Sequence, residues 1–370
     1  MKKIVHLTSA HPRFDTRIFV KQCCSLAQKY ETYLVVADGK GNEIKDRVNI
    51  LDVGKFNGRK NRMLNAPKAV FEKALTLDAD IYHMHDPELI PIGLKLKKIG
   101  KKVIFDAHED LPNQIMSKHY LNPISKKLIA FLVKAYEKYA CTKIDGIIAA
   151  TPFIRDKFLK INKSSIDINN YPKLEEFSSI PKDTLKENQV CYIGGLADVR
   201  GIIEMIRAIS LTQSTTKLTI AGNFADKNLE QSVMAMDGWH KVNFLGYVGR
   251  DEIRNTLASS IAGLVVLHPT RSYLDSLPVK MFEYMCAGIP VIASDFPLWR
   301  EIVDDAKCGL YVDPLKPLEI AASINYMHDH PVEAKQMGQN GRKAVLEKYN
   351  WNIEEAKLFN FYEKILSKSV

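Results

Sequence analysis

The stretch His268–Asp295, HPTRSYLDSLPVKMFEYMCAGIPVIASD, decides the fold of this chain. The apolar run 261–267 before it is typical of a buried strand, and the stretch itself predicts a polar loop, a helix and a second buried strand, 291–294. Gly288 suits the left-handed end of the helix, and Pro290 opens the strand. Strand, helix and strand in this order indicate a parallel sheet covered by helices.

The start of that helix is where we expect the chemistry. Ser276 is a candidate cap, and Pro278 suits the first turn. Free N–H groups and the helix dipole favour an anion there. Lys280 adds a positive charge that a bound phosphate would offset, and Glu283, one turn further, could accept sugar or ribose hydroxyls. The alternative is that Lys280 and Glu283 are only a solvent-exposed i, i+3 pair.

An acid, seven residues and a glutamate form an ordered motif here: Asp275, Glu283 and the run MFEYMCAGIPVIAS. This motif resembles that of the retaining glycosyltransferases of family 4 (group 1 type), where the pattern is usually E-x7-E. Asp275 stands for the first glutamate and is one methylene shorter. Lys280 resembles the PxKxFEYMAxG subgroup. The resemblance implies an α/β protein of the GT-B fold, with two Rossmann-like doubly wound domains facing a central cleft.

The length of 370 residues predicts two domains. A polar stretch at 178–188, which contains Pro181, is the expected boundary. We therefore predict an N-terminal acceptor-binding domain over residues 1–180 and a nucleotide-sugar-binding domain over residues 181–348. By resemblance to GT-B proteins, the final helix, 349–370, crosses back to the first domain.

The composition, 46% apolar and 26% charged, is that of an ordinary soluble protein. No run of about 18 apolar residues is present, and the N-terminus leads directly into a strand pattern, so neither a membrane span nor a signal peptide is expected. The six cysteines are scattered without a C-x-x-C pair. This favours reduced thiols in a cytoplasmic protein and no zinc site.

The net charge of +9 is concentrated in three basic clusters of the first half. They are Lys55, Arg59, Lys60, Arg62, Lys68 and Lys73; Lys95, Lys97, Lys98, Lys101 and Lys102; and Lys118, Lys126, Lys127, Lys134, Lys138 and Lys143. Each could be a solvated face, a nucleic-acid site, or a surface for anionic membranes or phosphorylated substrates. The third cluster flanks the apolar segment LIAFLVKAYEKYA, and a basic amphipathic helix favours a membrane surface. We expect peripheral binding on the inner face of the membrane.

Short apolar runs alternate with amphipathic segments in the first half, which predicts a parallel sheet with helices on both faces. The expected strands are 2–7, 32–37, 81–84, 103–106 and 146–150, and the expected helices are 15–29, 64–76, 91–98 and 124–141. Thr151 is a candidate cap for a further helix. Ligands of such sheets bind beyond the carboxyl ends of the strands.

Two loops at these strand ends carry candidate side chains. The loop after the first strand lacks glycine and has Arg13 and Arg17, which could contact the donor phosphates. The alternative is that Asp15 caps a helix beside two surface arginines. His83 and His85 alternate on a strand, but without an evident third ligand we do not expect a metal.

His108 follows a third strand, in the sequence FDAHE. Its position resembles that of the family histidine near the donor sugar, where an imidazole would orient a hydroxyl. The alternative is a strand-end histidine with its hydrogen bonds satisfied.

A glycine-bearing turn opens the second half, where strand 189–193 is followed by Gly194, Gly195 and a helix. This geometry suits a phosphate. The family segment usually reads GRLxxxKG, so Gly195 stands at the arginine position and Arg200 at the lysine position. The segment VNFLGYV resembles VxFxGxV, whose loop holds the nucleotide base, and Tyr247 could stack on that base.

The resemblance implies a retaining, metal-independent glycosyltransferase without a cofactor. It would move a sugar from a nucleotide diphosphate sugar, with a UDP-sugar favoured, to a hydroxyl of a glycan or lipid-linked acceptor in surface polysaccharide synthesis. Fixed positive charge would stabilise the leaving diphosphate, as an oxyanion hole does. Asp275 and His108 would hold the donor sugar, and Glu283 the ribose. The predicted catalytic residues are His108, Asp275 and Glu283, and the predicted donor-binding residues are Arg13, Arg17, Gly194, Gly195, Arg200, Tyr247, Ser276, Leu277, Pro278, Val279, Lys280 and Glu283.

Other functions stay open at this point. A GT-B nucleotide-sugar epimerase would share the fold and donor site but would need no acceptor. A basic nucleic-acid-binding protein is less favoured, because aromatic residues are not interleaved with the lysines, and no nucleic acid is expected as a partner. A dinucleotide dehydrogenase is disfavoured, since no G-x-G-x-x-G follows the first strand.

Overall fold

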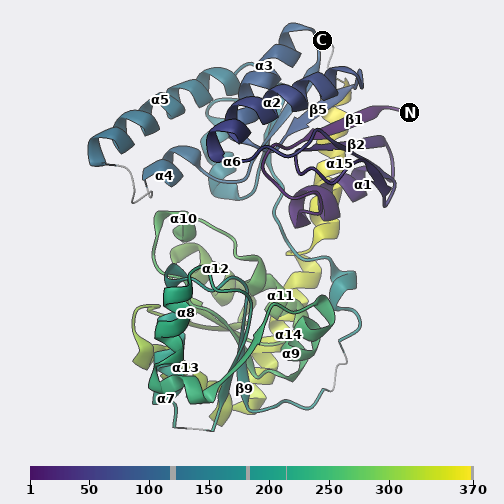
Figure 1. Ribbon diagram of the computed structural model, residues 1–370. Coiled ribbons are helices and arrows are strands. Elements are labelled where there is room, and N and C mark those ends of the chain that lie inside the picture. Colours follow the sequence, from purple (N-terminus) through teal and green to yellow (C-terminus); the bar gives the residue numbers. More distant parts are fainter. Residues whose placement is uncertain (117–121, 181–183, 214, 368–370) are drawn as a thin grey trace. The chain divides into compact units, whose positions relative to one another are not determined.

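The structure is a computed structural model (Figure 1). It describes residues 1–116, 122–180, 184–213 and 215–367. The chain divides into two compact units, Met1–Asn170 together with the residues from Asn352 on, and Tyr171–Trp351. Each unit contains a sheet of mainly parallel strands with helices on both faces, which confirms the predicted α/β class.

The described part of the first unit contains an eight-stranded sheet in the order β3-β4-β2-β1-β5-β6-β7-β8. Its strands are β1 (Lys3–Leu7), β2 (Glu31–Val36), β3 (Glu43–Lys45), β4 (Val48–Asp52), β5 (Ile81–Met84), β6 (Lys102–Ala107), β7 (Gly146–Ala149) and β8 (Ser165–Asp167). Neighbouring described strands run parallel, except that β3 and β4 are antiparallel. Because β3 and β4 form the half-exposed edge of the sheet, they lack the continuous apolar runs that identified most of the other strands.

Helices cover both faces of this sheet. One face packs on α2 (Arg59–Leu75), α3 (Ile90–Lys98), α5 (Pro123–Cys141) and α6 (Pro152–Leu159). The other packs on the π-helix η1 (Thr16–Cys23), on α1 (Cys24–Leu26) and on α15 (Trp351–Ser367). The short elements are η2 (Pro87–Leu89) and α4 (Leu111–Met116). Thr151 caps α6 as predicted, accepting from the N–H of Ile154 at 3.3 Å.

The described part of the second unit contains a parallel six-stranded sheet in the order β11-β10-β9-β12-β13-β14. Its strands are β9 (Gln189–Ile193), β10 (Lys217–Ala221), β11 (Val242–Gly246), β12 (Ala262–Val265), β13 (Val291–Ser294) and β14 (Gly309–Val312). Its helices are η3 (Leu174–Phe177), η4 (Asp198–Arg200), α7 (Ile202–Leu211), α8 (Lys227–Met234), η5 (Asp237–Lys241), α9 (Arg250–Ser259), α10 (Arg271–Leu274), α11 (Val279–Ala287), α12 (Pro297–Ala306), α13 (Pro317–Asp329) and α14 (Pro331–Glu347). The central strands β9, β12 and β13 are buried along their whole length.

The second unit begins at Tyr171, earlier than the boundary at 180/181 expected from the sequence. The reason is that Tyr171, Phe177 and Ile180 are buried in the core of this unit together with Phe282. Residues 181–183 of the expected linker lie outside the described residues. No helix in the described part of the chain has the length and apolar character needed to cross a bilayer.

Candidate active site

The predicted helix is present as α11, and Gly288 ends it in the left-handed conformation with φ 74°. Its start differs from the prediction. Pro278 occupies the cap position, and Ser276 does not cap the helix, because its Oγ donates to the carbonyl of Tyr273 at 2.9 Å. The carbonyl of Ser276 accepts from Trp299 Nε1 at 2.7 Å, which fixes the loop before the helix. The other predicted residues of this segment, Leu277 and Val279, are half-buried.

The ammonium of Lys280 is buried, although the residue as a whole is partly exposed. Its Nζ lies 3.7 Å from the ring centroid of Tyr192, a cation–π contact, and the described residues offer it no hydrogen-bond partner. Burial lowers the pKa of Lys280 well below its usual range, and Arg200 lowers it further, while Glu283 opposes both effects. The alternative of a solvent-exposed pair with Glu283 is therefore wrong.

A glycine turn after β9 faces this lysine. A Cβ atom at Gly194, whose φ is 140°, would lie 3.1 Å from Lys280 Nζ, and one at Gly195 would lie 3.0 Å from the Nη1 of Arg200. Arg200 Nη1 donates to the carbonyl of Gly195 at 3.3 Å. Gly195, which stands at the family's arginine position, thus leaves room for the guanidinium of Arg200. The glycine turn therefore lies beside two cations, Arg200 and Lys280.

Glu283 is held by an arginine that the sequence did not single out. Arg250 Nη1 donates to Glu283 Oε1 at 2.9 Å, and its Nη2 lies 3.5 Å from Glu176 Oε2. The only available signal was the position of Arg250 just after the base-loop motif VNFLGYV. Tyr247 in that motif is 82% exposed, and Asp275 is half-buried directly after α10.

Arg13 and Arg17 are buried and bind acids within the first unit. Arg13 donates to both carboxylate oxygens of Asp38, at 2.8 and 2.6 Å, and pairs with Glu43. Arg17 donates to both oxygens of Asp106, at 3.0 and 2.7 Å. These bonds hold the two guanidinium groups inside the unit and explain why neither arginine is a surface residue.

Asp15 caps η1 and accepts from the backbone N–H groups of Arg17 and Ile18 at 2.8 and 2.9 Å. This part of the alternative for the first loop is confirmed. The predicted helix 15–29 is present as η1 followed by α1. It is shorter than expected and ends at Leu26.

His108 lies beside a buried carboxylate. Its Nε2 is 3.3 Å from Asp106 Oδ2 and 3.4 Å from His85 Nδ1, and its side chain is 20% exposed. Gln22 Nε2 donates to the same oxygen of Asp106 at 2.7 Å. Burial alone would raise the pKa of Asp106, but Arg17 and His108 hold it well below its usual range. Asp106 is therefore an ionised group buried at the end of β6.

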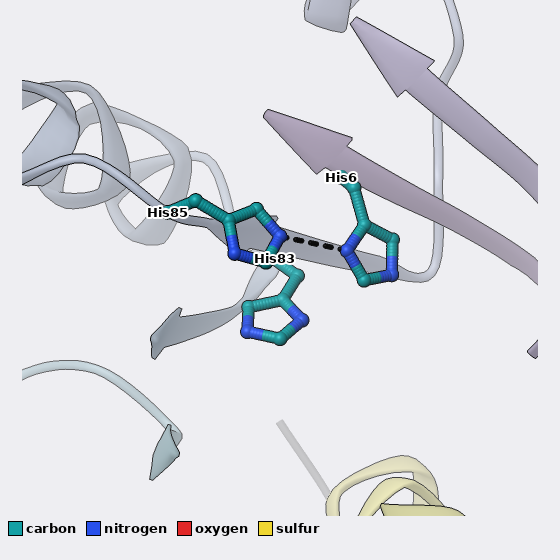
Figure 2. A group of neighbouring side chains, drawn as sticks. All are labelled: His6, His83 and His85. Carbon is teal, nitrogen blue, oxygen red and sulfur yellow. Dashed lines mark hydrogen bonds between the residues drawn. The ribbon is translucent and has the colours of Figure 1, made fainter. Parts of the chain in front are cut away.

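Three histidines lie together, as Figure 2 shows. One of them, His85, has its Nδ1 3.3 Å from Asp106 Oδ2. His6 of β1 pairs in register with His83 of β5, and His85 follows β5. His6 Nδ1 lies 2.8 Å from His85 Nε2, and His83 Nδ1 lies 2.6 Å from the hydroxyl of Tyr362 in α15. The sequence did not reveal His6 as a neighbour, because its strand is far from the other histidines along the chain.

These groups satisfy the distance requirement for a metal site. Ligand atoms of His6, His83 and His85 all lie within 4.8 Å of one another, as do those of His85, Asp106 and His108. His6 thus adds the third candidate ligand that the sequence did not show. However, the rings already contact one another and Tyr362, and a metal would have to replace those contacts. That no metal is needed stays a prediction.

A cavity of about 780 Å³ lies at the other end of α11, lined by Ala287, Gly288 and Pro290. It contains none of the predicted donor residues. Its lining residues Ile180 and Thr184 flank residues 181–183, which are outside the described part of the chain. The start of α11, where Lys280 and the glycine turn meet, stays the candidate donor site.

Known proteins match this chain along most of its length. The family model described as "Glycosyl transferases group 1" matches residues 175–344, and "Glycosyltransferase Family 4" matches residues 21–168. An uncharacterized glycosyltransferase of Methanocaldococcus jannaschii is 26% identical over 302 residues, covering 77% of this chain and 75% of that protein. The O-antigen chain mannosyltransferase RfbU of Salmonella typhimurium is 24% identical, covering 61% and 64%. The structure of Anabaena HepE in complex with UDP-glucose has a TM-score of 0.74 at 14% identity, covering 98% and 100%.

Two units with mainly parallel sheets, a glycine turn facing the buried ammonium of Lys280 and these matches define a glycosyltransferase of the GT-B fold. The chain belongs to the group 1 glycosyltransferase family, since the two family models together span most of it. Neither a nucleotide-sugar epimerase nor a nucleic-acid-binding protein is supported by these matches.

Proposed function

We propose that the protein transfers a sugar from a nucleotide diphosphate sugar to an acceptor hydroxyl, with retention of anomeric configuration and without a metal. The observation that carries this proposal is the ammonium of Lys280, buried over Tyr192 with no hydrogen-bond partner among the described residues. A buried cation without a partner is costly. A diphosphate would provide the missing charge and the missing acceptors.

The surroundings of Lys280 suit a diphosphate. Arg200 adds a second cation, the Gly194 turn allows the backbone to come close, and α11 begins at Val279, so the positive end of its dipole lies there. As the bond between sugar and diphosphate breaks, negative charge grows on the leaving oxygen, and these groups would stabilise it. On a front-side path, that oxygen takes the proton of the acceptor hydroxyl while the acceptor oxygen bonds to the anomeric carbon on the same face.

We assign the remaining donor contacts as follows. Glu283, oriented by Arg250, binds the ribose, and Tyr247 stacks on the base. Asp275 and His108 hold the donor sugar. Anabaena HepE, which shares the fold, has been solved with UDP-glucose, and this favours a UDP-sugar.

Arg13 and Arg17 are left out of the donor site, in contrast to the expectation from the sequence. Their guanidinium groups already bind Asp38 and Asp106, and opening either ion pair would leave a buried charge without a partner.

For the acceptor we propose a glycan or lipid-linked intermediate of a surface polysaccharide, met at the cytoplasmic face of an anionic membrane. The relative RfbU acts on an O-antigen chain, and the first unit carries the lysine clusters that suit phosphates and anionic lipids. The six cysteines, all within the described ranges, form no disulfide with one another, which suits a reducing compartment.

Thermal unfolding with UDP, GDP, ADP and a dinucleotide tests the donor site. A ligand at about a hundred times its Kd should stabilise the protein by roughly 2.7 kcal/mol. We expect one nucleoside diphosphate to do so, and we expect Lys280→Met and Glu283→Ala to weaken the effect. Lys343→Met, an exposed lysine of α14 in the same unit, serves as the matched control. The proposal fails if no nucleotide stabilises the protein, or if Lys280→Met responds as the control does.

A further inference from the structure

Helix α5 presents an apolar stripe to solvent. Ile124, Leu128, Phe131 and Tyr139 recur at i, i+4, i+7 and i+15, so they lie on one side of the helix, and Leu132 widens the stripe. Each of these five residues is more than half exposed, with Ile124 at 82% and Phe131 at 68%. In Figure 1, α5 lies at the edge of the first unit next to α4. Soluble proteins rarely expose this many large apolar side chains together without a partner.

The charge around this stripe has one sign. Lys127, Lys134 and Lys138 are exposed and border the stripe along one side of the helix. Glu137 is the one acid in the sequence of α5, and it is buried and paired with Lys157. The exposed surface of α5 is therefore apolar and positive. Lys118, the first lysine of this cluster, lies outside the described residues.

The second basic cluster differs from α5 in that acids pair with its lysines. Lys97 binds Asp145 at 2.8 Å, and Lys101 pairs with Asp78. These lysines are partly neutralised by acids. Unopposed lysines beside an apolar stripe therefore set α5 apart from the second basic cluster.

We propose that the α5 face, made of the apolar stripe and its three lysines, docks on a bilayer that contains anionic lipids. The stripe enters the boundary between headgroups and acyl chains, and the lysines contact lipid phosphates. Docking of two copies through this face is disfavoured, because it would bring like charges together. The inference rests on the proposed function only for its purpose, which is to bring the enzyme to a lipid-linked acceptor.

Co-sedimentation of the full-length protein with vesicles tests the α5 face. Vesicles of phosphatidylcholine alone are compared with vesicles that also contain phosphatidylglycerol. The two test variants are Lys127→Gln/Lys134→Gln/Lys138→Gln and Leu128→Ser/Phe131→Ser. A matched control, Lys55→Gln/Lys60→Gln/Lys68→Gln, removes the same charge from exposed lysines elsewhere in the first unit.

We expect the wild type to bind only the anionic vesicles. The α5 lysine variant should bind about 100-fold more weakly, since each lysine near the surface is worth about 1 kcal/mol. The Leu128/Phe131 variant should also lose binding, and the control should keep most of it. Circular dichroism checks that every variant is folded.

Three results would overturn the docking proposal: equal loss in the control, full binding by the Leu128/Phe131 variant, or a dimer in sedimentation equilibrium that this variant abolishes. Nucleotide-induced stabilisation is measured on the same variants. If it persists while vesicle binding is absent, the docking proposal fails and the proposed reaction stands. If vesicle binding is present without any nucleotide response, the docking proposal stands and the proposed reaction fails.

Discussion

His6 Nδ1 lies 2.8 Å from His85 Nε2, although the two residues belong to different segments of the sheet. Burial lowers the pKa of His6 well below its usual range and that of His85 to about 3, so both rings are neutral at pH 7. One of the two nitrogens must therefore carry the proton and the other must accept it. The ionised carboxylate of Asp106 lies 3.3 Å from His85 Nδ1, and this contact determines which nitrogen carries the proton. His85 donates from Nδ1 to Asp106, so its Nε2 accepts from His6.

We predict that His6, His83 and His85 all carry their proton on Nδ1. With Nδ1 of His6 protonated, its Nε2 accepts from the hydroxyl of Tyr362 at 3.5 Å, and the Tyr362 oxygen accepts from His83 Nδ1 at 2.6 Å. His83 Nε2 is then a lone acceptor, in agreement with its lack of a partner in the described structure. Nitrogen-15 NMR of the imidazole rings at pH 7 reads the tautomers directly.

The matched variant for this test is Tyr362→Phe, which removes one hydroxyl and keeps the ring. It should shift the signals of His83 and His6 and leave the Nδ1 proton of His85 in place, because Asp106 still holds it. An Nε2 proton on His85 or His6 in the wild type would contradict the assignment.

Asp106→Asn should destabilise the first unit by about 3–5 kcal/mol, because it leaves the buried guanidinium of Arg17 without its charge partner. Asp78→Asn, which breaks an exposed pair with Lys101, should leave the stability nearly unchanged. Denaturant unfolding followed by far-UV circular dichroism is the measurement. Fluorescence would miss the effect, since Trp239, Trp299 and Trp351 all belong to the second unit.

The difference in stability between the wild type and Asp106→Asn should depend on pH in a defined direction. The pKa of Asp106 is depressed in the folded protein, so its contribution is present above the unfolded value of about 3.9 and is lost as the pH falls further. The gap between wild type and Asp106→Asn should therefore be widest near neutral pH and narrow below about pH 4. A stability difference that grows below about pH 4 would show that a group other than Asp106 is responsible for it.

The sequence predicted the parts of this protein that follow from local pattern. Strands buried on both faces appear as continuous apolar runs, and the β9, β12 and β13 segments were found for that reason. The position of Lys280 in the first turn of α11 predicted a cation at a helix start. The alternative for the first loop, Asp15 as a cap, also came from local pattern, because a cap depends only on the next few residues.

Contacts between distant segments could not be predicted in this way. The guanidinium of Arg200 lies where a side chain at Gly195 would otherwise be, and only the folded turn shows that the loss of one family cation leaves room for another. His6 meets His83 because β1 and β5 are neighbours in the sheet, which the sequence spacing does not state. Arg250 reaches Glu283 from a different helix. In each case the partner is fixed by strand order or helix packing rather than by local pattern.

Lys280→Met should make the ligand-free protein more stable by about 1–4 kcal/mol, because it replaces a buried cation that has no hydrogen-bond partner among the described residues with an apolar chain of similar length. Tryptophan fluorescence in a denaturant titration reports this change in the second unit. Lys343→Met, at an exposed position, should stay within about 0.5 kcal/mol of the wild type. A clear loss of stability in Lys280→Met would mean that Lys280 is structural rather than reserved for a ligand.

Binding of a nucleoside diphosphate should take up protons wherever Lys280 is neutral in the free protein, and the affinity should fall as the pH rises through that range. Burial and Arg200 hold the pKa of Lys280 well below its usual range in the free protein, so the ammonium loses its proton at a lower pH than an exposed lysine does. An anion beside Nζ raises that pKa and restores the charge, which couples binding to protonation. The ligand's own terminal phosphate, with a pKa of about 6, is already ionised near pH 8 and takes up no protons there.

Calorimetry at pH 8 in buffers of different ionisation enthalpy gives the number of protons taken up. We expect uptake in the wild type and in Glu283→Gln, and none in Lys280→Met; equal uptake in Lys280→Met would place the titrating group elsewhere and remove Lys280 from the phosphate site.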